Sequence, residues 1–301
     1  MVASRTFPVN MLKVCWFSTL RELGYSTTLS LHNPTSTLPN IDQSFQLAID
    51  LFSVQGELIE SGIEIGVLES GERFQIDIEE ILQMLKIEDD IVGVLHQTPQ
   101  SLAGLDFVPF DMNAITKWTV ATDDFIGYRH LKSGLQSGVH YQSPPMNDSR
   151  VQSSGITIMQ SPKVLVSPDT DTKLLCLAPS SDSDFRGSID FHLAILDQNG
   201  KIHGRTSLSI PARGRALVSV TELLRDHHSL SDFLELGGFG MLVGLATNGA
   251  LIPLALAINQ SGGLAIDHSL PPSYYIPWWG GAPKREAAES LTNRLFPGVS
   301  A

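Results

Sequence analysis

The chain has 301 residues, of which 42% are hydrophobic and 17% are charged. This length and this apolar fraction predict a globular protein of about two domains of roughly 150 residues each, and they exclude a disordered polar chain. The net charge is −12, from 20 basic and 32 acidic residues. Nucleic acid and anionic membrane surfaces are therefore excluded as expected partners, because both require a basic patch.

The N-terminal segment and the two cysteines bear on the compartment. The apolar run near the N-terminus is too short and too interrupted for a secretory signal, so a cytoplasmic location is the default expectation. Cys15 and Cys176 are the only cysteines. Two buried free thiols are the favoured state for them, and a single bridge is the alternative.

From residue 28 onward the chain contains two related copies, offset by about 145 residues. The stretch TLSLHNPTS (28–36) matches KLLCLAPSS (173–181) at two apolar positions and a proline. The stretch 45–82 then matches 189–224 with only two one-residue gaps, and this alignment places Gly71 opposite Gly214. Such self-similarity predicts two domains that arose by internal duplication.

Each copy has the pattern of short β-strands. Apolar residues alternate with period 2, as expected for strands with one buried face, and turn residues separate the runs. A short helical patch with early acidic residues follows, at 79–85 and 221–226. The expected strands cover 45–51, 63–67 and 74–78 in the first copy, and 189–195, 208–210 and 216–220 in the second. This spacing predicts an all-β fold with short helices, built as two tandem β-sandwich domains.

The phrases GYSTTLSLHNPT, LFSVQGELIE and ILDQNGKIHG resemble β-sandwich modules of bacterial surface and secreted proteins. Those modules pair a Thr-Leu-x-Leu-x-Asn-Pro strand with an Asp-x-x-Gly hairpin. The first copy keeps Asn33-Pro34 and lacks the Asp, whereas the second keeps Asp197 and lacks the Asn. The resemblance implies an immunoglobulin-like architecture and a non-catalytic role in adhesion or scaffolding, and it carries over no functional residue.

The uncharged segment 237–258 is long enough to cross a bilayer as a helix. Asn248-Gly249 lies at its centre, however, and an Asn-Gly pair between apolar runs is a strong hairpin signal. Pro253 and five glycines also oppose a helix. We therefore expect two buried strands here and no membrane span.

Motifs that carry chemistry are scarce. The sequence has no G-x-S-x-G elbow, no H-E-x-x-H and no C-x-x-C. Three histidines lie near the ends of the copies, and they are the candidate ligands if a metal ion is bound between the domains: His130, His140 and His268. In the alignment of the copies His268 faces Tyr141 rather than His140, so a repeated metal site is not indicated. No other cofactor is expected.

The last distinctive stretch, DHSLPPSYYIPWWGG (267–281), concentrates aromatic residues among prolines. Trp and Tyr anchor interfaces and stack on sugars, so four residues here are the candidate binding residues: Tyr274, Tyr275, Trp278 and Trp279. Docking on the chain's own body or on a second subunit is favoured over a ligand platform.

These observations predict domains at 1–150 and 151–276, with a C-terminal aromatic and Pro-rich extension at 277–301. The leading functional hypothesis is a non-catalytic binding or assembly protein whose partner is a protein, a second copy of the chain or a glycan. The alternatives are a metal-dependent enzyme or binder with a site between the domains, and a purely structural homo-oligomer.

Overall fold

The computed structural model describes residues 6–9, 12–37, 43–109, 123–140, 156–180, 185–268 and 282–298. The chain divides into two compact units. The first comprises Met1–Ser53, Leu58–Arg129 and Gly138–Ser143, and the second comprises Val54–Glu57, His130–Ser137 and Pro144–Ala301. The predicted domain boundaries near 150 and 276 fall outside the described residues and stay predictions.

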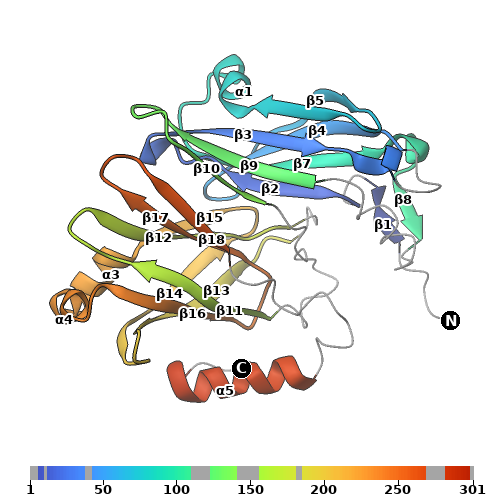
Figure 1. Cartoon of the computed structure of the whole chain (residues 1–301). Coiled ribbons are helices and arrows are strands. Elements are labelled where there is room, and N and C mark those ends of the chain that lie inside the picture. Colours follow the sequence, from blue (N-terminus) through green and yellow to red (C-terminus); the bar gives the residue numbers. More distant parts are fainter. Residues whose placement is uncertain are drawn as a thin grey trace. The chain divides into compact units, whose positions relative to one another are not determined.

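Strands dominate both units, which confirms the all-β prediction (Figure 1). The strands of the first copy are β1 (Thr6–Pro8), β2 (Val14–Ser18), β3 (Tyr25–His32), β4 (Phe45–Ser53), β5 (Leu58–Leu68), β6 (Arg73–Asp77), β7 (Ile91–Pro99), β8 (Phe107–Pro109), β9 (Asp123–His130) and β10 (Gln136–His140). Those of the second are β11 (Thr157–Leu165), β12 (Thr170–Leu177), β13 (Ser188–Asp197), β14 (Ile202–Pro211), β15 (Arg215–Ser219), β16 (Phe239–Ala246), β17 (Ile252–Asn259) and β18 (Leu264–His268). The helices are α1 (Ile78–Leu85), α3 (Val220–Asp226), α4 (Leu230–Glu235) and α5 (Ala282–Leu295).

The order of strands in the sheets shows the duplication directly. The first sandwich has the sheets β10-β9-β3-β6 and β2-β7-β4-β5, and a small sheet pairs β1 with β8. The second has the sheets β18-β17-β12-β15 and β11-β16-β13-β14. Each strand of the second pair of sheets occupies the place of its counterpart in the first pair, and a short helix, α1 or α3, follows the same strand in both copies.

Strand register agrees with the sequence repeat. In the first sandwich Leu29 of β3 lies opposite Ile76 of β6. In the second, Leu174 of β12 lies opposite Val218 of β15, which is the same pairing shifted along the chain. The sequence alignment had matched Leu29 to Leu174 and Ile76 to Val218, so residues that it matched occupy equivalent places in the paired strands.

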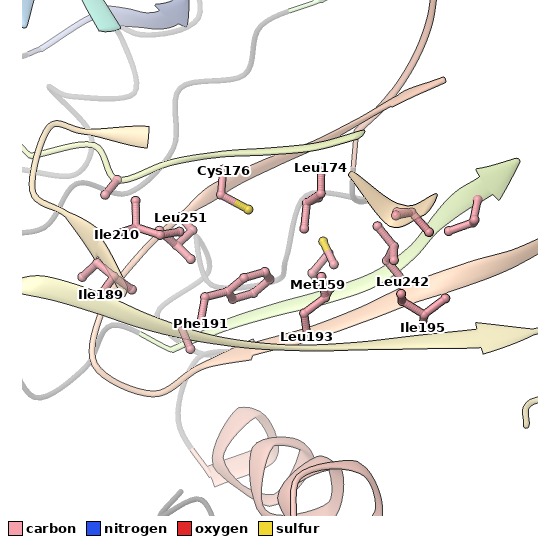
Figure 2. Packing of buried hydrophobic residues seen from close by; sticks show 14 of the residues in the cluster. Met159, Leu174, Cys176, Ile189, Phe191, Leu193, Ile195, Ile210, Leu242 and Leu251 are labelled. Carbon is pink, nitrogen blue, oxygen red and sulfur yellow. The ribbon is translucent and has the colours of Figure 1, made fainter. Parts of the chain in front are cut away.

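A dry apolar core joins the two sheets of the second sandwich. Leu174 and Cys176 of β12 face Phe191 and Leu193 of β13, with Met159 of β11 beside them (Figure 2). All five residues are less than 1% exposed, and each removes its full apolar surface from water, which is the main stabilising contribution to a sandwich.

Helix α5 covers the outer face of the sheet β11-β16-β13-β14. Its residues Ala288 and Leu291, together with Phe296 just after it, pack against apolar residues of β13 and β16 such as Leu196 and Leu245. Arg205 of β14 donates a hydrogen bond from Nε to Leu295 O at 2.6 Å, which satisfies one of the free carbonyls at the helix C-terminus. This part of the C-terminal extension therefore docks on the chain's own body.

The segment 237–258 forms two strands, as predicted, but they do not pair with each other. β16 lies between β11 and β13, whereas β17 lies between β12 and β18 in the other sheet. Asn248 accepts a hydrogen bond from Asp190 N at 3.0 Å and donates one to Ser188 O at 3.1 Å. The Asn-Gly pair thus belongs to a connection between sheets, and reading it as a hairpin turn was wrong. No helix in the described ranges is long and apolar enough to span a membrane.

Two details of the sequence alignment are also corrected. Gly71 N donates to Asn33 O at 2.7 Å, and Arg213 N donates to Ala178 O at 2.8 Å, so Gly71 corresponds to Arg213 rather than to Gly214. Both residues have positive φ, +82° and +61°, so Arg213 occupies a conformation that favours glycine. Two backbone hydrogen bonds hold Arg213 there. Arg213 N donates to Ala178 O, and the N–H of the next residue, Gly214, donates to Pro211 O within the turn.

The second correction concerns the last hairpin of each copy. His130 N bonds Leu135 O in the first copy, and Asn259 N bonds Gly263 O in the second. The turn that matches Ser261-Gly262 is therefore Ser133-Gly134, because the first loop is one residue longer. As a result His140 and His268 are both the fifth residue of equivalent strands, and the expected match of His268 to Tyr141 was wrong.

Candidate functional site

The structure leaves the two predicted sites open. Tyr274, Tyr275, Trp278 and Trp279 lie outside the described residues, so their role as binding residues stays a prediction. For the metal hypothesis, the described ranges contain no group of three or more His, Cys, Asp or Glu that could hold a metal ion. The assignment of His130, His140 and His268 as ligands likewise stays a prediction.

His130 is already engaged within its own turn. Its Nδ1 lies 2.8 Å from Ser133 Oγ and accepts the backbone N–H of Ser133 at 3.2 Å. The Nδ1 atom is therefore turned toward its own loop. His140 and His268 are exposed at the ends of β10 and β18.

Asn33, the residue of the Asn-Pro motif, has a structural role. It is fully buried and donates from Nδ2 to Gln43 O at 2.7 Å and to Leu68 O at 3.3 Å. Its Oδ1 accepts from Thr35 N at 3.2 Å and from Thr35 Oγ1 at 2.7 Å. These bonds tie together three loop segments. Because they engage the donors and the acceptor of the side chain, no polar group of Asn33 is left to bind a ligand.

Each sandwich contains one His–Asp pair, at different places in the fold. His96 Nε2 lies 2.9 Å from Asp50 Oδ2, and His203 Nε2 lies 3.0 Å from Asp197 Oδ2. Burial alone would raise the pKa of Asp197, but the hydrogen bonds from His203 and from the backbone of the β13–β14 turn outweigh burial and lower it. Asp197 thereby fixes that turn, through Asn199 N at 2.8 Å and Lys201 N at 3.0 Å. This Asp of the Asp-x-x-Gly motif is structural, like Asn33.

A buried ion pair lies on the inner side of β9. Lys13 Nζ is 3.7 Å from Asp124 Oδ2, and both side chains are only 4% exposed. Gln97 Nε2 donates to the same oxygen at 2.7 Å. Burial raises the pKa of the nearby Cys15 thiol, Asp124 raises it further and Lys13 opposes this rise. The thiol is therefore neutral and buried, which is the reverse of what a reactive cysteine requires.

The outer side of the sheet that contains β9 carries polar side chains that are partly open to solvent. Along β3, residues alternate strictly between buried and half-buried, and the half-buried side chains are polar: Ser26, Thr28, Ser30 and His32. On β6, Gln75 lies opposite Ser30 and is exposed. Within the described part of the chain, no hydrogen bond engages the side chains of Thr28, Ser30 or Gln75. We call this outer side of the sheet β10-β9-β3-β6 the open face.

Phe125 is the only large apolar side chain among the described residues of the open face. It lies on β9 and is 42% exposed, whereas its neighbours Asp124 and Ile126 point inward and are buried. A Cβ built on Gly138 of β10 would lie 2.3 Å from two ring carbons of Phe125, so the ring rests directly against the backbone of β10. Gly127, the next outward position on β9, also lacks a side chain. The hydroxyl of Thr28 occupies the space beside Gly127, 2.7 Å from where its Cβ would lie, so the ring has a small polar group beside it.

The second copy does not preserve this surface. The repeat places Lys173, Leu175 and Leu177 of β12 where Thr28, Ser30 and His32 stand on β3, and both leucines are buried. The sandwich fold thus tolerates either polar or apolar residues at these positions. The composition of the open face is a property of the first copy and not a requirement of the fold.

Comparisons with known proteins identify no family for this chain. No family model matches the chain, and no curated protein matches it. One similar solved structure is a calcium-binding mutant of Bacteroides uniformis beta-glucuronidase 2, with 9% identity, a TM-score of 0.18 and coverage of 85% of this chain and 26% of that chain. Another is a beta-glucuronidase from glycoside hydrolase family 2, with 8% identity, a TM-score of 0.17 and coverage of 87% and 25%.

A third is a putative beta-galactosidase from Bacteroides fragilis, with 10% identity, a TM-score of 0.16 and coverage of 88% of this chain and 35% of that chain. The chain spans about a quarter to a third of these proteins. At such TM-scores the likeness is one of β domains in general and carries no argument about function.

Sequence reasoning did not find the open face. Its signal is the alternation in DDFIGYRH (123–130), where Phe125 and Gly127 share one side of a strand and Ile126 and Tyr128 share the other. Tyr128 is buried and donates to Ser18 O at 3.0 Å, which joins the two sheets of the first sandwich. Without the partner strands, Phe125 reads as one more core residue, because the side of a strand that faces solvent depends on its neighbours.

Proposed function

We propose that the chain is a non-catalytic binding protein whose partner docks on the open face of the first sandwich. The observation that carries the proposal is the set of uncommitted polar side chains around an exposed ring: Thr28, Ser30 and Gln75 beside Phe125. These side chains are available to bond a ligand. The buried polar residues described above differ from them, because their hydrogen bonds are all internal. An immunoglobulin-like classification of the sandwiches stays a prediction.

Four side chains that could have served in chemistry are committed to the fold, and this supports binding rather than catalysis. Asn33 and Asp197 are saturated by structural hydrogen bonds. The thiol of Cys15 is buried with a raised pKa, and so is that of Cys176. A catalytic group must reach a reacting atom of the substrate, and none of these side chains is accessible.

The test places a bulky charge at the centre of the open face. Ser30→Arg keeps the buried side of β3 unchanged, because the side chain points outward. Purified full-length protein is screened for binding to an oligosaccharide array and to a phage-displayed peptide library. We expect at least one ligand to bind the wild type and to bind Ser30→Arg at least tenfold more weakly.

Ser61→Arg is the matched control, since it makes the same change at an exposed position of β5, in the other sheet. It should leave binding unchanged, and both variants should keep the thermal midpoint of the wild type. Equal binding by wild type and Ser30→Arg would refute the open face as the binding surface. Turnover of any bound ligand would refute the non-catalytic assignment.

A further inference from the structure

We infer that the ligand of the open face is an uncharged oligosaccharide, one sugar ring of which stacks on Phe125. This inference rests on the proposed function and specifies the class of ligand. Three features support it: the position of the aromatic ring, the polar groups in the rows beside it, and the distribution of charge.

The aromatic ring is held in a position suited to stacking. Because Phe125 rests against the backbone of Gly138, the ring lies close to the sheet and exposes its other side. With 42% of the residue exposed, this is far from the buried state that a phenylalanine usually adopts. The ring fills the space beside Gly138, and Thr28 Oγ1 fills the space beside Gly127, so a flat, rigid group can contact the exposed side of the ring with a hydroxyl next to it. The less polar face of a pyranose ring, which carries axial C–H groups, is such a partner.

Polar groups extend away from the ring across the sheet. Ser30 lies on β3 and Gln75 lies opposite it on β6, so β9, β3 and β6 present Phe125, a hydroxyl and an amide in adjacent strands. Neighbouring strands are ~4.8 Å apart, so the row from β9 to β6 extends about 10 Å, the length of roughly two sugar rings. A hydroxyl and an amide each donate and accept hydrogen bonds, as the hydroxyl groups of a sugar do.

Charge distinguishes a neutral sugar from an anionic one. Thr28, Ser30, Gln75 and Phe125, at the centre of the open face, are all uncharged. Charged side chains lie beyond them on the same side: Arg73 opposite His32, Arg129 toward the end of β9, and Asp77, which already accepts the N–H of Glu79 as the N-cap of α1. The whole chain carries a net charge of −12, which repels anionic polymers at long range. An uncharged ligand meets neither a charged centre nor that repulsion.

A peptide fits the open face less well than a sugar. Peptides bind sheets by adding a strand to an edge, where the backbone has free N–H and C=O groups, or by filling apolar pockets. The open face lies over the two central strands β9 and β3, whose backbones are paired on both sides. Binding there depends on side chains, and the described ones at the centre of the face are a single ring and small polar groups, with Arg73 and Arg129 farther out.

The experiment measures the affinity of full-length protein for labelled neutral oligosaccharides and for oligosaccharides that contain uronic acid. We expect the wild type to bind a member of the neutral set. Phe125→Leu, which keeps an apolar side chain and removes the ring, should weaken that binding about tenfold, because stacking on an aromatic ring contributes on this scale. Gln75→Ala should weaken it severalfold.

Phe239→Leu is the matched control, because Phe239 is also exposed, at 57%, but lies on β16 of the second sandwich. It should leave the affinity unchanged. Binding of uronate-containing sugars alone, or neutral binding that Phe125→Leu does not weaken, would overturn the inference. If a peptide binds instead and Ser30→Arg abolishes its binding, the inference fails while the proposed function stands.

Discussion

Replacing Asn33 by alanine tests the view that the Asn-Pro motif is structural. The second copy provides a natural precedent, because Ala178 occupies the equivalent position and its backbone makes the equivalent hydrogen bonds. Asn33→Ala should therefore keep the backbone path of the first copy. It should lose only the four side-chain bonds to Gln43, Leu68 and Thr35.

The expected loss of stability follows from what remains paired. Gln43 O still accepts from Thr35 Oγ1 at 3.1 Å, and Thr35 Oγ1 still lies 2.9 Å from Ser70 Oγ. Thr35 N and Leu68 O each lose their bond to the asparagine. A buried polar group left unpaired costs about 1–3 kcal/mol, so the total is about 3 kcal/mol. For a unit of about 150 residues this lowers the melting temperature by about 6–12 °C.

Differential scanning calorimetry would measure the change, and hydrogen exchange of peptides from each copy would assign it to the first sandwich. Ser30→Ala, on the strand that leads into Asn33, is the control: its side chain points outward, so its effect should stay within about 0.5 kcal/mol. A loss for Asn33→Ala below about 1 kcal/mol, or no larger than for Ser30→Ala, would refute the structural role of the motif.

Three further predictions concern the second sandwich. Gly244→Ala should lower the free energy of unfolding in urea by at least about 1–3 kcal/mol, because its Cβ would lie 2.1 Å from a core phenylalanine ring. The control Gly187→Ala, with its nearest contact at 3.5 Å, should be nearly neutral. Equal losses in the two variants would contradict this account. The pKa of Asp197 is lowered in the folded state, so its stabilising contribution is complete at neutral pH and is lost as pH falls through that lowered pKa. Asp197→Asn should therefore be less stable than the wild type at pH 7 and should lose less stability on acidification. Parallel curves of stability against pH for the two proteins would contradict the lowered pKa. Phe296→Ala should cost about 3 kcal/mol, because the ring is only 4% exposed beneath the end of α5; the exposed Phe239→Ala should cost little, and a similar loss in both would argue against docking of α5.

The predictable parts of the fold are those in which local pattern and tertiary context agree. Alternation predicted strands that lie within β4, β5, β13 and β14. In β4 and β13 it reflects one side against a core, whereas in β5 only Leu68 is buried. Ile78 and Val220 continue that alternation and were expected in strands, but both begin helices. The preceding Asp77 and Ser219 accept N–H groups of the first turn, and such capping overrides the apolar period.

Other features depend on which strands become neighbours. Asn248-Gly249 has the composition of a hairpin turn, yet the strands on either side join different sheets. Arg213 adopts a conformation that sequence rules assign to glycine. The exposure of Phe125 is set by β10, to which it is adjacent only in the folded sheet. In all three cases the arrangement of neighbouring strands decides the outcome, and the pattern within one strand does not encode it.

The shared strand order of the two sandwiches has a consequence for folding. A nascent chain contains two sets of strands with the same topology, so a strand of one copy can in principle pair within the other, a known failure of tandem repeats. The cores discourage such exchange. In the first copy Phe17 of β2 fits over Gly93 of β7, whereas in the second Phe191 of β13 fits over Gly244 of β16. An exchanged strand would place its phenylalanine ring against a position that has no glycine. The core of each copy therefore disfavours strands of the other.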